Sequence, residues 1–143
     1  MKEYIDIGEQ RITLSWDRHE QCLAIISPRF IQEPDATLFL PKGQRNLSSE
    51  APLYLRHFIS AYKDLKANSF TAIGQKAFEG RYWGKRLSEQ PQMHLVWTRF
   101  TFENHPESQP LELAFNDAEH DPYTLWVTRF QGLELNSVER RTW

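Results

Sequence analysis

Two identical tripeptides, Thr98-Arg99-Phe100 and Thr128-Arg129-Phe130, are the residues of this chain best suited to bind a partner, and each follows a tryptophan within two residues. Because side chains alternate between the two faces of a strand, Trp97 and Arg99 fall on one face, and Arg129 joins them if the second tripeptide lies in the same sheet. Tryptophan and arginine are enriched at protein-binding hot spots, and they also stack on unpaired bases and contact phosphates. The pattern predicts a binding platform on an exposed sheet face, although an ordinary solvated face would show the same residue types.

A second stretch, Arg81-Tyr82-Trp83-Gly84-Lys85-Arg86, interleaves aromatic and basic residues in a similar way. The predicted binding residues are therefore Trp97, Arg99, Arg129, Arg81, Trp83, Lys85 and Arg86. The formal net charge of −2 favours a protein partner, because domains that bind nucleic acid usually carry a basic excess. We predict a non-catalytic binding or accessory module of the inhibitor, immunity or adaptor type, with single-stranded nucleic acid as the alternative partner.

Charge is distributed unevenly along the chain. Basic residues outnumber acidic ones from 42 to 86, whereas 103–121 contains six acidic residues and neither lysine nor arginine. Two solvated surfaces of opposite sign would give this pattern, and so would a basic region that steers an acidic partner. The oligomeric state stays open, because regions of opposite charge could also pair two copies.

Enzymatic chemistry has weaker support. The chain lacks a nucleophile elbow, a glycine-rich phosphate loop, a His-Glu-x-x-His motif and paired cysteines. The acidic segment Asp117–Asp121, which includes His120, could hold a divalent cation, and a metal-dependent enzyme centred there is the second alternative. Such a segment is more often a turn before a strand. We therefore predict no metal ligand, no cofactor and no catalytic residue.

The composition indicates one globular domain over residues 1–143, since 40% of the residues are hydrophobic and 13% are aromatic. The single cysteine, Cys22, excludes an internal disulfide and favours a reducing compartment. It lies in an apolar run, where burial would raise the thiol pKa and make the residue inert. The chain shows no signal sequence, and no segment approaches the ~18 apolar residues of a membrane span. We therefore expect a cytoplasmic protein without membrane contact.

The elements that must position these residues can be predicted from periodicity. Residues 10–16 alternate as a half-buried strand, and a polar break before the apolar run 22–26 predicts a hairpin. Residues 4–7 and 37–40 suggest two short strands. Three aromatic-rich segments, 94–102, 111–115 and 124–130, predict a meander, because turn-rich segments separate them.

One amphipathic helix is predicted over about 50–67, where apolar residues recur every three or four positions. Ser48 or Ser49 would supply the N-cap oxygen and Asn68 would end the helix. A second, shorter helix around Ile73 to Phe78 is left open, because glycines nearby disfavour it. The predicted fold class is α+β, with an antiparallel sheet of about five to six strands and the helix packed on one face.

Overall fold

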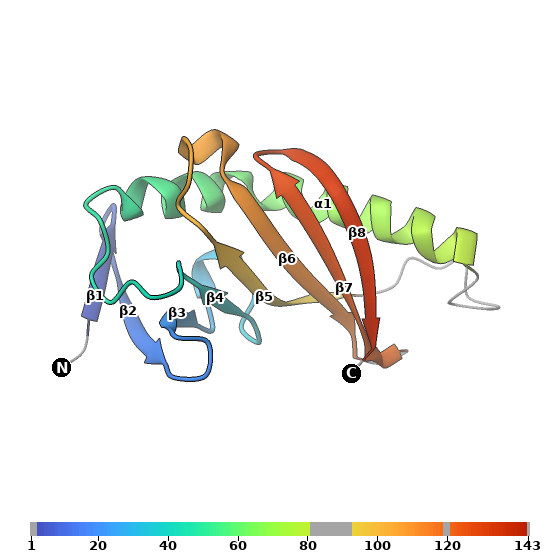
Figure 1. The fold of residues 1–143 in the computed structure, drawn as a ribbon, viewed down its shortest axis with the longest axis horizontal. Helices are drawn as coiled ribbons and strands as arrows, with labels where there is room; N and C mark the ends of the chain where they lie inside the picture. The colour runs from blue at the N-terminus through green and yellow to red at the C-terminus, as the bar shows by residue number, and fades with distance from the viewer. Residues whose placement is uncertain (1–2, 81–92, 119–120, 143) are drawn as a thin grey trace.

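The computed structural model describes residues 3–80, 93–118 and 121–142. Eight strands form one sheet in sequence order, and one long helix covers one of its faces (Figure 1). The elements are β1 (Glu3–Ile7), β2 (Gln10–Asp17), β3 (Cys22–Ile26), β4 (Thr37–Phe39), α1 (Ala51–Gly80), β5 (His94–Phe100), β6 (Pro110–Asp117), β7 (Asp121–Gln131) and β8 (Glu134–Thr142). The α+β class is confirmed, and the sheet has more strands than the predicted five to six.

The pairing of β4 with β5 departs from the predicted antiparallel sheet. These two strands run parallel, while every other neighbouring pair is antiparallel. Parallel neighbours cannot be joined by a tight turn, so the chain must cross a face of the sheet between them. The helix α1 is part of that crossing, which explains why it covers one face only.

The predicted hairpin is confirmed. Strand β2 pairs with β3 with Ser15 opposite Ala24 and Trp16 opposite Leu23. Ile12 and Leu14 are buried while their neighbours are exposed, which is the alternation expected of a strand with one face on the core. The short strands β1 and β4 also form where the sequence indicated them.

The helix is longer than predicted and does not stop at Asn68. It continues to Gly80, so the separate shorter helix proposed around residues 73–78 is the end of the same element. Ser69, Ile73 and Ala77 are fully buried at four-residue spacing, and the Ser69 hydroxyl lies 2.9 Å from the hydroxyl of Thr128 on β7. These tertiary contacts outweigh the weak helix propensity of the segment.

The helix starts at Ala51, as predicted to within one residue, but the residue before it is Glu50 rather than Ser48 or Ser49. The amide of Tyr54 donates to the carbonyl of Glu50, which places Glu50 immediately before the helix. Ser48 accepts the amide of Ala51 on its backbone carbonyl. Pro52 lies in the first turn, where its missing N–H costs nothing.

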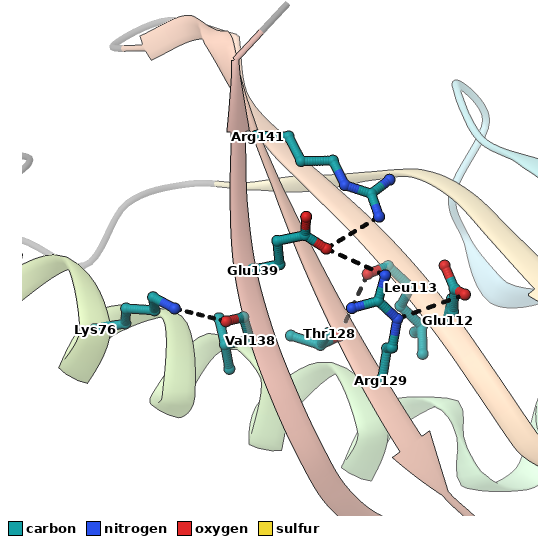
Figure 2. A network of polar contacts seen from close by, with 8 residues as sticks. All are labelled: Lys76, Glu112, Leu113, Thr128, Arg129, Val138, Glu139 and Arg141. Atoms are coloured by element: carbon teal, nitrogen blue, oxygen red, sulfur yellow. Dashed lines mark hydrogen bonds and ion pairs between the residues drawn. The ribbon is translucent and has the colours of Figure 1, made fainter.

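The helix α1 is long enough to cross the whole width of the sheet. Its 30 residues extend ~45 Å, while the seven intervals between eight strands span ~34 Å. The helix therefore contacts both edge strands, β1 and β8 (Figure 1). Near its end, Lys76 Nζ donates to the carbonyl of Val138 on β8 at 2.7 Å (Figure 2). Among the described residues, no helix has the length and apolar character to cross a membrane.

Strand β8 is the element that the sequence analysis missed, so the predicted three-stranded meander has four strands. Its sequence, ELNSVERRT, holds only one β-branched aliphatic residue and no aromatic residue. It forms at the edge, paired with β7 through the turn at Gly132, where φ is +60°. An edge strand needs little apolar content, so local composition gave no signal.

Candidate functional site

The predicted platform residues lie on the face of the sheet opposite α1, which we call the outer face. Phe100, Trp126 and Phe130 are buried in the core beneath the helix. Alternation along the strands therefore places Trp97, Arg99 and Arg129 on the outer face.

The predicted residues Arg81, Trp83, Lys85 and Arg86 lie outside the described residues. The geometry of the site therefore rests on β3 to β8 and the neighbouring loops.

The outer face carries a row of alternating charges across three strands. The register sets Arg99 opposite Glu112, and Glu112 opposite Arg129. Arg129 Nε lies 3.5 Å from Glu112 Oε1, and its Nη2 lies 3.1 Å from Glu139 Oε2 on β8 (Figure 2). Arg141 Nη2 reaches the same oxygen of Glu139 at 3.0 Å. We call Glu112, Arg129, Glu139 and Arg141 the charge ladder.

Hydrogen bonding favours the ionised forms of Glu139 and Arg141. The bond from Arg141, assisted by that from Arg129, lowers the pKa of the Glu139 carboxyl. The same bond raises the pKa of the Arg141 guanidinium. Because these side chains are about 40% exposed, their pairing fixes geometry more than it stabilises the fold.

Arg99 is held separately at the other side of the face. Its Nη2 donates to Glu20 Oε2 at 2.7 Å, and its guanidinium lies 5.0 Å from the ring centres of both Phe39 and Trp97. These distances are within the range of cation–π attraction. One face of each ring is therefore already occupied by the guanidinium.

An apolar row runs beside the charges on the same face. The register aligns Ile26, Thr37, Trp97, Ala114 and Val127 on five successive strands. Ala114 and Val127 are buried with Leu125 in a small cluster against which Trp97 packs. Ile26, at the end of this row, is 66% exposed. A single exposed aliphatic side chain is ordinary, so the weight of Ile26 as a contact residue rests on its alignment with Trp97 in the same row.

A groove of about 780 Å³ opens over the strand ends of this face. The residues that line it come from the loops after β4 and β5 and from β5, β6, β7 and β8. The polar residues that line it are Lys42, Gln44, Arg99, Thr101, Glu103, Glu112, Arg129, Gln131, Asn136, Ser137 and Arg141.

The acidic segment proposed as a metal site is partly incorporated in the sheet. Asp117 is buried at the end of β6 and is paired in register with Asp121 at the start of β7. Within the described ranges, histidine, cysteine and acidic side chains form no group of three that could hold a metal ion. Glu119 and His120 lie outside those ranges.

Cys22 is fully buried, and burial raises the pKa of its thiol, as the sequence predicted. We expect a thiol reagent such as Ellman's reagent to label the native protein at least about a hundredfold more slowly than the urea-unfolded chain, because the reactive thiolate is both scarce and shielded. Rapid stoichiometric labelling of native protein would contradict this burial. Time-resolved absorbance under both conditions measures the ratio directly.

Among the charged residues of the site, the sequence analysis missed Glu20, Glu112, Glu139 and Arg141. Glu20 lies in the loop of the predicted hairpin, Glu112 lies in the predicted strand β6, and the other two lie in the edge strand that was not predicted. In a strand, Glu139 and Arg141 fall on the same face, where the acid and the base can pair. Because no strand was predicted here, this pairing could not be inferred from the sequence.

Comparisons with protein-family models, with curated proteins and with solved structures found no match.

Proposed function

We propose that this protein is a non-catalytic binding module that engages a protein partner through the outer face. The observation that carries the proposal is the exposed Ile26 and the half-buried Trp97, aligned in one row of the outer face that runs beside a charge ladder whose arginines are already paired. Apolar side chains next to fixed arginines and an aromatic ring are the usual composition of a protein-binding hot spot.

Single-stranded nucleic acid is less well supported by the same surface. A base that stacks on Trp97 would find one face of the ring beneath the guanidinium of Arg99. Stacking on aromatic rings contributes much of the affinity for single-stranded nucleic acid. With one face of the Trp97 ring covered, the outer face offers little aromatic surface for stacking.

An enzymatic role receives no support from the outer face. The ionisable side chains there neutralise one another in pairs. A general acid or base needs a perturbed proton affinity near the working pH, whereas Glu139 is held ionised. The face is therefore better suited to recognition than to proton transfer.

We expect Ile26→Glu to weaken partner binding by at least about tenfold, because a charge would replace an exposed apolar contact. Tagged wild-type and variant proteins would be compared by quantitative capture from lysate of the source cells. The captured protein would then be purified and titrated by calorimetry.

Leu53→Glu is the matched control, because Leu53 is 54% exposed and lies in the first turn of α1. The control should retain the wild-type affinity. Retained binding in Ile26→Glu together with loss in Leu53→Glu would place the interface on the helix and contradict the proposal. Tight, salt-sensitive binding of a single-stranded oligonucleotide that Ile26→Glu abolishes would favour the alternative function.

A further inference from the structure

More cationic than anionic side chains line the groove on the outer face. Lys42, Arg99, Arg129 and Arg141 all line it, whereas Glu20 and Glu139, which anchor the arginines, do not. The acidic side chains that do line it are Glu103 and Glu112. The groove lining therefore contains four cations and two carboxylates, while Glu20 and Glu139 contact three of these cations from outside the lining.

The arginines that line the groove are positioned in advance and keep unused donors. Arg129 and Arg141 both contact one oxygen, Oε2 of Glu139. Each guanidinium has five N–H donors, so the contacts with Glu139 and Glu112 leave several free. Because Glu139 restricts both side chains, a ligand would pay less entropy to order them.

The neutral polar side chains of the groove can also donate hydrogen bonds to a ligand. Gln44, Gln131, Asn136 and Ser137 can each donate hydrogen bonds from their side chains. Together with the cations they form a lining rich in donors. Carboxylates satisfy such a lining well, since arginine and carboxylate form paired, charge-assisted hydrogen bonds.

We infer that the groove receives an acidic segment of a protein partner, whose carboxylates bind between Arg129, Arg141 and Lys42. This inference rests on the proposed function and specifies the chemistry of the partner. A peptide is inferred rather than a nucleic acid strand, because the guanidinium of Arg99 already lies over the Trp97 ring on which a base would stack.

The test uses a fluorescein-labelled peptide of alternating glutamate and serine, about eight residues long, which spans roughly 26 Å when extended. Fluorescence anisotropy at low salt would compare wild type with the double variant Arg129→Gln/Arg141→Gln. We expect the double variant to bind at least about tenfold more weakly. Binding to wild type should also weaken as salt is added.

The control variant is Arg56→Gln/Lys63→Gln, which removes the same charge from two exposed positions of α1. It should bind within about twofold of wild type, because the two positions lie on the helix and outside the groove. Its change in net charge equals that of the double variant, so it controls for the overall charge effect. Circular dichroism of both variants would verify that the fold is retained.

Each other outcome overturns the inference. Absence of peptide binding to wild type, or equal weakening in both variants, would show that the groove has no preference for an acidic segment. An oligothymidine that binds more tightly than the peptide, with the same dependence on Arg129 and Arg141, would assign the groove to nucleic acid.

Failure of this inference can be separated from failure of the proposed function. A partner that is lost with Ile26→Glu but retained by Arg129→Gln/Arg141→Gln would support the outer face as the interface. The same result would exclude an acidic segment of the partner as the occupant of the groove.

Discussion

Glu33→Ala is expected to lower the free energy of unfolding by about 3 kcal/mol. Glu33 lies in the loop between β3 and β4 and is 4% exposed. Its carboxylate accepts hydrogen bonds from Tyr62 Oη at 2.9 Å, Lys66 Nζ at 2.5 Å and the Leu95 amide at 3.2 Å. One side chain therefore ties the loop to the helix and to β5.

The size of the effect follows from what the alanine leaves behind. Tyr62 and the Leu95 amide are buried donors, and an unsatisfied buried donor costs about 1–3 kcal/mol. Lys66 is partly exposed and can turn toward water, so its loss adds little. Burial, reinforced by the Glu33 carboxylate, raises the pKa of Tyr62 well above its usual value, so its hydroxyl stays a donor.

Urea unfolding followed by tryptophan fluorescence would measure the change. Glu9→Ala, in the exposed turn between β1 and β2, is the control and should stay within about 0.5 kcal/mol of wild type. Glu33→Gln keeps one acceptor oxygen and should fall between the two. A loss below about 1 kcal/mol in Glu33→Ala would mean that the three donors find other acceptors.

Gly132→Ala is expected to destabilise the protein by about 3 kcal/mol. Two effects contribute, backbone strain at a positive φ and a steric clash of the added Cβ, and the same substitution at Gly8 separates them. Gly132 has a φ of +60°, and a Cβ there would lie 2.4 Å from the carbonyl oxygen of Glu107. The Gly132 amide also donates to the carbonyl of Gln109 at 3.0 Å. The clash is with backbone, which cannot move aside as a flexible side chain can.

Gly8→Ala is the matched control, since its φ is +61° and a Cβ added there would have no neighbouring atom within 4 Å. It should show only the cost of the left-handed conformation, about 1 kcal/mol. The difference of about 2 kcal/mol between the variants, measured by urea unfolding, would then report the contact itself. Equal losses would show that the segment before β6 moves away freely.

The contact at Gly132 also shapes one end of the groove. The side chain of Gln131 donates to the carbonyl of Ser108, and both Gln131 and Pro110 contribute to the lining. The close approach of the β7–β8 turn to residues 107–109 therefore supports the wall beside the charge ladder. A glycine is required there because any side chain would separate the two segments.

The sequence by itself determined the elements whose signal is local. Alternation at Ile12 and Leu14 marked β2, and the recurring apolar residues from Leu55 to Leu65 marked the first half of α1. Aromatic-rich runs marked β5, β6 and β7, and alternation within them identified the face that carries Trp97, Arg99 and Arg129. Each of these features is set by the periodicity of its own segment.

Only the tertiary structure decided the features that depend on partners distant in the chain. Strand β8 forms because β7 offers it an edge, and α1 continues past Asn68 because Ser69 and Ile73 are buried against the sheet. The strand register then brings Glu112 and Glu139 to Arg129 from the two neighbouring strands. Local propensity carries no information about such pairings, because register is set by the burial of whole faces.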